Sequence, residues 1–294
     1  FNMCVWFEVM LISSFVLLAL GGGRQQLQAA LKYVTLNLLS SVLFLTAIGL
    51  LYGLTGTLNI AELALRVPEV EHQKLLTAVA VLFLCAFGIK AGMVPFFFWV
   101  PAAYVAPPAA VTALFAALLT KGGVYAIIRV FGLLFMHDAD EMTVLYTVLL
   151  WLSGITMVLG VLGAASQPVV RRILAFHSVS QVGYMLMGPA VAGLALAAAL
   201  RSDGAEAEAA RTAATIVLAG SVLFMIHHAV VKMSLFMVAG LMIAKCGSDD
   251  LRRVAGLYRR DWLLGLLFMA VALSLAGIPA LSGFWAKLAL VRGG

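Results

Sequence analysis

Residues 82–110 read LFLCAFGIKAGMVPFFFWVPAAYVAPPAA, an apolar stretch in which glycines and prolines surround a single lysine, Lys90. Proline removes a backbone donor and clashes with the preceding helical turn. Broken backbone at membrane depth is tolerated only where it is buried in protein or lines a wet cavity. The stretch therefore predicts a discontinuous helix inside a membrane protein.

The rest of the chain supports this class. Of its 294 residues 64% are hydrophobic and only 11% are charged, whereas a soluble domain is about 25% charged. Each long apolar run suffices to cross a hydrocarbon core of about 30 Å. We predict an all-α polytopic membrane protein, a single transmembrane domain over 1–294 with about eight membrane segments. The segments are 1–20, 28–53, 75–94 with an extension to 107, 109–134, 142–164, 172–200, 213–243 and 262–291.

A second interruption lies near the end of the chain. Residues 272–290 read ALSLAGIPALSGFWAKLAL, with Gly277 and Pro279 before Lys287. Two interrupted helices in separate parts of a transporter indicate inverted repeats and a binding site near the midplane. We expect 1–134 to belong to a first repeat and 142–294 to a second, although the sequence shows no strong residue-level repeat.

The loops alternate in charge. Those around Arg24, Arg171 and 245–260 are basic, and the segment 137–141 (HDADE) is acidic without calcium-loop spacing. The positive-inside rule places the basic loops in the cytoplasm and the first residue on the outer side. The net charge of +6 is explained by these loops, so we expect no nucleic-acid partner.

Common cofactor signatures are missing from the sequence. The three cysteines, Cys4, Cys85 and Cys246, are isolated, with no CxxC or Cys/His ligand spacing. No GxGxxG or GxxxxGK[ST] motif indicates a nucleotide site. We therefore expect neither cofactor nor metal. The start FNMCVWFEVM and the end ALVRGG suggest a piece of a longer protein.

Ionisable residues inside the apolar segments are the candidate functional groups. A charge at bilayer depth costs about 2.5–3.5 kcal/mol on insertion scales, so such groups are paired, hydrated or functional. Glu8 either lies near an interface or pairs with a lysine. Lys90 lies beside the first break or snorkels to the surface. Lys121, near the middle of 109–134, cannot easily snorkel.

Further candidates follow later in the chain. His228 and Lys232 are four residues apart in MIHHAVVKMSLF and share a helix face, whereas His227 points elsewhere. The pair suits a proton relay better than a metal site, because no further ligands are near. His177 with its neighbouring polar residues either extends this path or is an interior hydrogen-bonded histidine. Lys287 lies just past the second break.

Several blocks of sequence resemble a known family. Residues 89–130, 171–188, 227–243 and 275–290 are similar to the hallmark blocks of proton-conducting antiporter-like subunits. These subunits occur in Mrp-type multisubunit sodium/proton antiporters and in respiratory complex I. The opening segment 5–41 and LYGLTGTLNIAELALRV (51–67) most resemble the D-subunit branch of Mrp (Pha) antiporters.

The resemblance implies a fourteen-helix subunit with two inverted five-helix repeats, of which this chain would hold helices five to twelve. It also implies roles for matching residues. Glu8 would pair with Lys90, Lys121 would be the central lysine, His228 and Lys232 the relay, and Lys287 the terminal lysine. The chain departs from the family at Phe97, Ala102 and 169–170, where His, Asp and an acid–Leu pair are frequent. These departures either weaken a polar link between half-channels or mark the branch.

The sequence thus predicts a subunit of a multisubunit monovalent cation (Na⁺ or K⁺)/proton antiporter in the bacterial plasma (cell inner) membrane. Its partners would be other subunits and the bilayer, and it would not be a self-contained enzyme. Protons would pass along Glu8, Lys90, Lys121, His177, His228, Lys232 and Lys287. The alternatives are a proton-pumping subunit of NADH:quinone oxidoreductase (complex I) and a structural subunit whose buried charges are vestigial.

Overall fold

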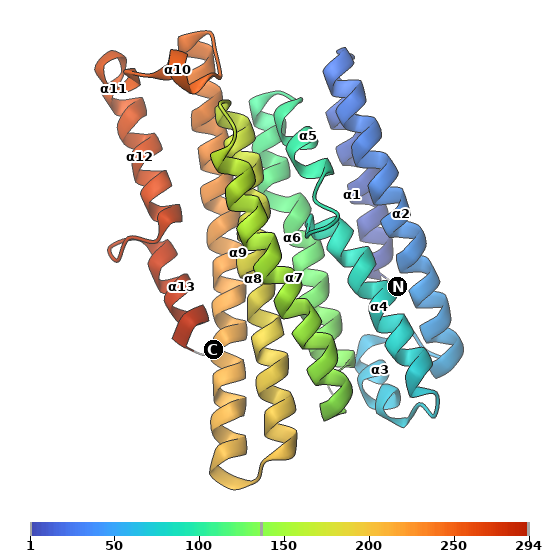
Figure 1. The fold of residues 1–294 in the computed structure, drawn as a ribbon. Helices are drawn as coiled ribbons and strands as arrows, with labels where there is room; N and C mark the ends of the chain where they lie inside the picture. The colour runs from blue at the N-terminus through green and yellow to red at the C-terminus, as the bar shows by residue number, and fades with distance from the viewer. Residues whose placement is uncertain (1, 136–137, 293–294) are drawn as a thin grey trace.

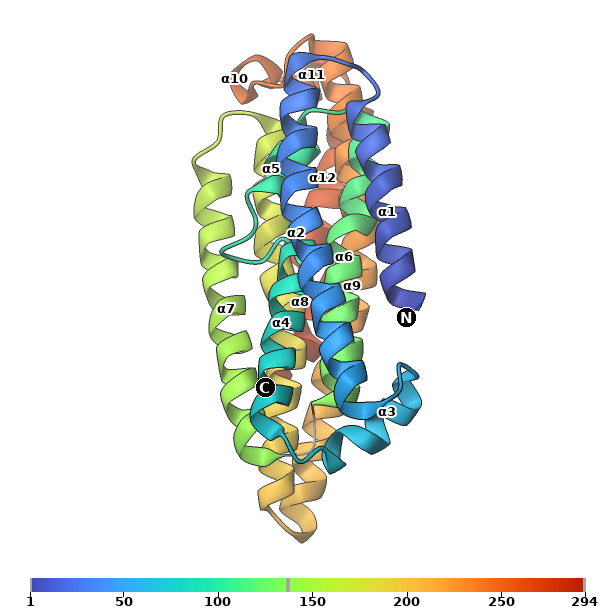
Figure 2. The same ribbon diagram turned by 90° about the vertical axis from the view of Figure 1, so that its right-hand side faces the viewer.

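The computed structural model describes residues 2–135 and 138–292, and the regular elements in these ranges are all helices. Figures 1 and 2 show the long helices side by side in one bundle. His137 of the predicted acidic segment lies outside the described residues. The elements are α1 (Asn2–Ala19), α2 (Arg24–Thr55), α3 (Ile60–Arg66), η1 (Val67–Glu69), α4 (Gln73–Ala91), α5 (Trp99–Val105), α6 (Ala109–Leu134), α7 (Ala139–Ala165), α8 (Val170–Arg201), α9 (Gly204–Cys246), α10 (Leu251–Val254), α11 (Leu257–Arg260), α12 (Trp262–Ala276) and α13 (Ser282–Arg292).

The predicted membrane segments are present. Seven described helices are long and apolar enough to cross a membrane: α1, α2, α4, α6, α7, α8 and α9. The eighth segment is divided into α12 and α13, and the third into α4 and α5. The predicted all-α polytopic fold with two discontinuous helices is therefore confirmed.

Both discontinuities begin with the same helix cap. Gly92 after α4 and Gly277 after α12 adopt the left-handed conformation, with φ of 73° and 91°. The next amides, of Met93 and Ile278, donate to the carbonyls of Gly88 and Leu273 at 3.0 and 3.4 Å. This is the Schellman pattern, which ends a helix by binding its last carbonyls. Glycine and the proline that follows shortly afterwards explain why each helix stops there.

Close packing between helices depends on small residues. A Cβ on Gly183 of α8 would lie 2.8 Å from the amide nitrogen of Met157 on α7, so only glycine permits this approach. Gly160 of α7 abuts the backbone of Ser180 in the same way. Small residues let membrane helices pack at short distance, where van der Waals contact is strongest. Bulky apolar side chains instead face outward, such as Trp151 on α7.

The connecting loops alternate between the two ends of the bundle. The α1–α2 and α7–α8 turns and the α10–α11 segment lie at the upper end in Figure 1, and α3 and the α8–α9 turn lie at the lower end. This is the arrangement that eight crossings require. The basic loops thus share one end, and the positive-inside rule predicts that this end is cytoplasmic.

Helical features within the predicted loops, such as α3 and the first turns of α9, were not predicted. The loop 54–74 contains α3, which begins where the Asn59 side chain accepts a hydrogen bond from the Ala61 amide. Helix α9 begins at Gly204 instead of 213, because the run AEAEAA after the glycine consists of good helix formers. At 1.5 Å per residue, α9 is roughly 65 Å long, about twice the thickness of a hydrocarbon core.

Candidate ion-conduction site

Several basic side chains are buried inside the bundle. Lys90 on α4 and Lys121 on α6 are only 3% and 6% exposed, and His228 and Lys232 on α9 are fully buried. Lysine is almost never fully buried in proteins unless it is paired. Their burial on three different helices therefore marks the candidate site.

The helix packing places Lys121 and His228 at one level. Helices α6 and α9 run in opposite directions (Figure 1), and Gly240 of α9 packs directly against Ala109 of α6. His228 precedes Gly240 by as many residues as Lys121 follows Ala109. The two side chains consequently lie opposite each other, and the charge of Lys121 acts on both His228 and Lys232.

Lys90 is held at the first break, facing α1 and α2. Its Nζ lies 3.5 Å from Ser41 Oγ and 5.2 Å from the centroid of the Phe7 ring. Within the described ranges no ion pair joins it to Glu8, although Glu8 is the carboxylate whose charge acts on Lys90. The expected Glu8–Lys90 ion pair is therefore not closed in this structure, because the ammonium sits against Phe7 and Ser41.

The α4 turn that carries Lys90 is fixed from across the break. Trp99 of α5 donates from Nε1 to the Ile89 carbonyl at 2.8 Å, and its ring packs edge-on against Tyr33 with centroids 5.2 Å apart. Tyr33 in turn shares a 2.5 Å hydrogen bond with Ser14 of α1. A chain of contacts thus links α1, α2 and α5 to the residue next to Lys90.

Lys121 and Lys232 bind backbone carbonyls. The Lys121 ammonium donates to the Ala116 carbonyl of its own helix. Lys232 Nζ reaches the Leu174 carbonyl of α8 at 2.8 Å, and the same oxygen accepts a hydrogen bond from Ser178 at 2.9 Å. Lys232 therefore joins α9 to α8 while its charge has no carboxylate partner among the described residues.

Polar atoms without partners accompany this row. His228 Nδ1 and Nε2, Thr120 Oγ1, Ser180 Oγ and Gln181 Oε1 are buried and have no hydrogen-bond partner among the described residues. An unsatisfied buried group costs about 1–3 kcal/mol, and most such groups in proteins bind ordered water instead. Several of them beside buried lysines indicate a polar path that water can complete.

His177 connects this path to Lys287. Its Nδ1 is also buried without a partner among the described atoms, and the charges of Lys232 and Lys287 both act on it. Lys287 itself donates to the carbonyls of Leu275 and Ala276 at the end of α12, both at 3.1 Å. The structure therefore brings the second-half candidates, His177, His228, Lys232 and Lys287, into one electrostatically linked set.

Sequence reasoning missed His227 as part of this set. Its side chain reaches the second break. His227 Nδ1 lies 3.0 Å from Ser282 Oγ at the start of α13. The only local signal for His227 was that it directly precedes His228. Its partner, Ser282, lies 55 residues away in sequence.

The departures from the family pattern converge on one crevice at the basic end of the bundle. Phe97, Ala102 and Val169 line it together with Arg172 of α8 and Lys32 of α2, in a volume of about 640 Å³. Phe97 also packs against Phe176, with ring centroids 6.2 Å apart. In this crevice, apolar side chains thus occupy positions where polar residues are frequent in the family.

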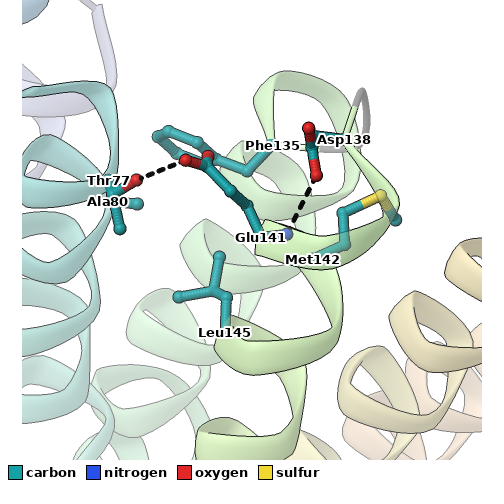
Figure 3. Close-up of a pocket in the computed structure, with 7 residues that line it drawn as sticks. All are labelled: Thr77, Ala80, Phe135, Asp138, Glu141, Met142 and Leu145. Atoms are coloured by element: carbon teal, nitrogen blue, oxygen red, sulfur yellow. Dashed lines mark hydrogen bonds between the residues drawn. The ribbon is translucent and has the colours of Figure 1, made fainter. Parts of the chain in front are cut away.

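The acidic segment at the opposite end has a structural role. Figure 3 shows Glu141 of α7 reaching Thr77 of α4, with an Oε1–Oγ1 distance of 3.1 Å, above a small cavity. Asp138 caps α7 by accepting from the Asp140 and Glu141 amides, and Asp140 pairs with Arg201 at 2.6 Å. In the described part of the chain no three His, Cys, Asp or Glu residues are grouped as metal ligands.

The fold and the buried row define a polytopic membrane protein with lysine and histidine residues linked between two broken helices. The chain belongs to the NADH:quinone oxidoreductase/Mrp antiporter transmembrane family, whose model matches residues 1–201 and 209–294. This confirms the family resemblance found in the sequence.

Named relatives agree with this assignment. The D subunit of the Na⁺/H⁺ antiporter of Alkalihalophilus pseudofirmus is 43% identical over 291 residues, which cover 99% of this chain and 54% of that protein. The protein of the same name from Bacillus subtilis is 42% identical over 294 residues, covering 100% and 55%. The chain therefore spans about half the length of these curated relatives, and their names confirm the resemblance to the D-subunit branch.

Solved structures share the fold. A chain of the Mrp complex from Dietzia sp. DQ12-45-1b superposes with a TM-score of 0.83 at 35% identity, covering 100% of this chain and 50% of that chain. A chain of the membrane-bound sulfane sulfur reductase, an archaeal respiratory membrane complex, gives a TM-score of 0.85 at 29% identity, covering 100% and 55%.

Proposed function

We propose that this protein is a subunit of a multisubunit Na⁺ or K⁺/proton antiporter and conducts protons along its buried lysine and histidine row. The observation that carries the proposal is the alignment of Lys121 with His228 and Lys232, buried on two antiparallel helices without a carboxylate partner among the described residues. Buried cations of this kind are costly and indicate an ion pathway by default.

The electrostatics of the row suit proton transfer. Two unit charges roughly 7–10 Å apart interact by about 2 kcal/mol at an effective dielectric constant near 20. This is more than the 1.36 kcal/mol that corresponds to one pKa unit. Protonation of one lysine therefore disfavours protonation of its neighbour, so a proton arriving at one site promotes release at the next.

The Glu8–Lys90 pair would act as a switch at one end of the row. With the pair open, as here, Lys90 retains its proton less firmly and can pass it toward Lys121. When Glu8 approaches and closes the pair, the proton is held on Lys90. Residue Ser41 provides the alternative partner that makes the open arrangement stable.

The two broken helices support an internal repeat. Helices α4 and α12 end with the same left-handed glycine cap, and each break carries a lysine, Lys90 before the first and Lys287 after the second. We propose that 1–134 and 142–294 belong to two inverted repeats. The site would then lie between them near the membrane midplane, as in other inverted-repeat transporters.

The cellular location and the partners of the protein are also part of the proposal. The relatives named antiporter subunits are bacterial, and one solved neighbour is part of an Mrp complex. We infer the bacterial cell membrane as its location and other subunits of a cation antiporter as its partners. The broad outward faces of α1, α2 and α7 carry large exposed apolar side chains, which suit contact with lipid or with neighbouring subunits.

A proton-pumping subunit of a respiratory complex is the second candidate. The family name includes NADH:quinone oxidoreductase, and the archaeal respiratory complex shares the fold. The 42–43% identity to antiporter D subunits over nearly the whole chain favours the antiporter. Copurification discriminates the two: small cation-antiporter subunits support the first, and quinone-reducing subunits support the second.

The test uses the full-length subunit in its complete complex, in everted membrane vesicles that report cation-driven collapse of a pH gradient. Lys121→Ala and His228→Ala are expected to reduce exchange to background while the subunits still copurify. Lys74→Ala, at an exposed lysine, is the matched control and should exchange normally. Wild-type exchange by Lys121→Ala in an intact complex would show that the row does not conduct protons.

A further inference from the structure

The ammonium of Lys287 lies in a cradle of oxygen atoms and one aromatic ring at the break between α12 and α13. Its Nζ donates to the carbonyls of Leu275 and Ala276, both at 3.1 Å, and lies 5.5 Å from the ring centroid of Tyr184 on α8. These carbonyls belong to the last turn of α12, where helical amide partners run out. The Lys287 ammonium is therefore a cation that is covalently attached to the chain and bound by these carbonyls.

Further polar atoms lie at the same break. Ser282 Oγ lies 3.0 Å from His227 Nδ1 and 3.4 Å from Ser274 Oγ. His227 is 8% exposed, and its Nε2 has no hydrogen-bond partner in the described part of the chain. A Cβ on Gly283 would lie 2.9 Å from this nitrogen. The same Cβ would overlap the Ser274 carbonyl oxygen, so glycine at this position lets the start of α13 pack against the end of α12.

These atoms suit an alkali cation as well as an ammonium. In membrane transporters, carbonyls of unwound backbone and the C-terminal ends of broken helices coordinate Na⁺. In K⁺ channels, rings of carbonyls replace the hydration shell of the ion. The partial negative charge of a helix C-terminus favours any cation, and the face of a tyrosine ring adds further attraction.

We propose that the cradle formed by the Leu275 and Ala276 carbonyls and the Tyr184 ring, with Ser282 at the same break, is a monovalent-cation site, which protonated Lys287 occupies and neutral Lys287 leaves to Na⁺ or K⁺. The inference rests on the proposed exchange function and locates the cation within this subunit. One proton leaves Lys287 for each cation that enters, so the cradle keeps a single positive charge. The two cations exclude each other, which couples cation binding to proton release.

The groups that face Lys287 support this exchange. His227 on α9 and His177 on α8 are the titratable side chains on which its charge acts, and Tyr184 is the aromatic contact. Among the described residues no carboxylate pairs with Lys287. A second cation in the cradle would therefore meet uncompensated repulsion, and the departing proton has histidine acceptors on two helices.

The test measures equilibrium binding of ²²Na⁺, and of ⁸⁶Rb⁺ as a K⁺ substitute, to the purified complete complex. Lys287→Arg keeps a permanent charge in the cradle, because arginine is not deprotonated in proteins. We expect at least tenfold weaker binding of the preferred ion in this variant. Lys287→Ala empties the cradle, and we expect binding at least as tight as in the wild type, although coupled exchange is lost.

Two further variants complete the design. Ser282→Ala in the Lys287→Ala background removes one oxygen and should weaken binding several-fold, whereas Lys74→Ala should leave binding and exchange unchanged. Equal ion binding by Lys287→Arg and Lys287→Ala in intact complexes would overturn the proposal. If wild-type vesicles exchange normally but the two Lys287 variants bind the ion equally, the cation site is rejected and the proposed function is retained. If wild-type vesicles show no exchange, the proposed function fails.

Discussion

Gly123 of α6 lies directly against the backbone of Lys90 and Ala91, and a Cβ at this glycine would be 2.8 Å from the Lys90 carbonyl carbon. The contact brings the end of α4 to within one turn of Lys121 along α6. The separation between the two lysine-bearing helices is therefore set by the absence of a side chain at position 123.

Adding a methyl group at this contact should separate the helices. We expect Gly123→Ala to reduce the free energy of unfolding by about 1–3 kcal/mol, as overpacking does, and to lower exchange by displacing Lys90. Gly132→Ala in the same helix meets nothing within 4 Å and should be neutral or slightly stabilising. Thermal midpoints of the two purified complexes provide the comparison, and identical midpoints would contradict the prediction.

The indole of Trp99 positions Lys90 without belonging to the row. Trp99→Phe removes the donor to the Ile89 carbonyl, and one hydrogen bond is worth about 0.5–1.5 kcal/mol. We expect a several-fold lower maximal exchange rate with little change in the apparent KM for the cation. Trp151→Phe, on the exposed face of α7, is the control. A change confined to protein yield would indicate a purely structural role.

The carboxylate of Glu8 is the acid that acts on Lys90, and one of its oxygens is buried without a partner in the described part of the protein. Glu8→Gln keeps the shape but removes the charge, so the switch cannot close. Exchange should fall at least several-fold in vesicles with an intact complex. The exposed Glu69→Gln should have no effect, and equal rates in both variants would exclude the switch.

Arg171 fastens the end of α5 to the second half of the protein. Its guanidinium donates to the carbonyls of Val105 and Pro107 at 3.2 and 3.1 Å. Hydrogen bonds to charged groups contribute about 1.5–3 kcal/mol, so Arg171→Ala should loosen the α5–α6 turn and slow exchange. Arg171→Lys should restore less than half of this loss, because a lysine ammonium lacks the planar guanidinium geometry in which Nη1 directs its two N–H groups at the two carbonyls. Full rescue by lysine would show that charge alone matters.

The contact between Lys245 and Asp261 should respond to acid. The hydrogen bond from Lys245 holds the pKa of the Asp261 carboxyl below its usual value, and the Leu264 amide lowers it further. Because the folded pKa is lowered, the stabilisation is complete above the ordinary carboxyl range and is lost as the pH falls through the lowered value. Asp261 also accepts from the Leu264 amide at the start of α12.

Hydrogen exchange at the first amides of α12, corrected for intrinsic rates, tests this behaviour. Protection should be constant near neutral pH and decrease in acid. In Asp261→Asn it should already be reduced at neutral pH and no longer depend on pH. Asp250→Asn, which removes the charge from the cap of α10 instead, should leave α12 unaffected. Retained pH dependence in Asp261→Asn would assign the effect to another group.

The helices and both breaks could be predicted because their causes are local. Long apolar runs and glycine followed by proline determine where Gly92 and Gly277 end their helices, whatever surrounds them. Charge inside an apolar run also identified Lys121 and Lys232 without any knowledge of packing. The same reasoning missed α3, because a single turn or two capped by Asn59 has too short a pattern to distinguish from a loop.

The partners of the site residues could not be predicted in the same way. Lys287 binds α12 carbonyls, Arg171 binds carbonyls beyond α5, and His227 meets Ser282, all through contacts between distant segments. Such pairings depend on helix register, which close approaches such as Gly240 on Ala109 determine. The resemblance named Glu8 and Lys90 as a pair, but only the folded structure shows which of its two arrangements the side chains adopt.

The length of α9 has a practical consequence for work on this protein. Because α8 and α9 together exceed the hydrocarbon thickness, the turn between them, at Ser202 and Asp203, stands clear of the bundle at the lower end of Figure 1. An epitope inserted there would be reached by antibody in intact cells if this end faces outward. A tag in the projecting α8–α9 hairpin would therefore show which side of the membrane this end faces. It could also be used to immobilise the complex and to orient it in images.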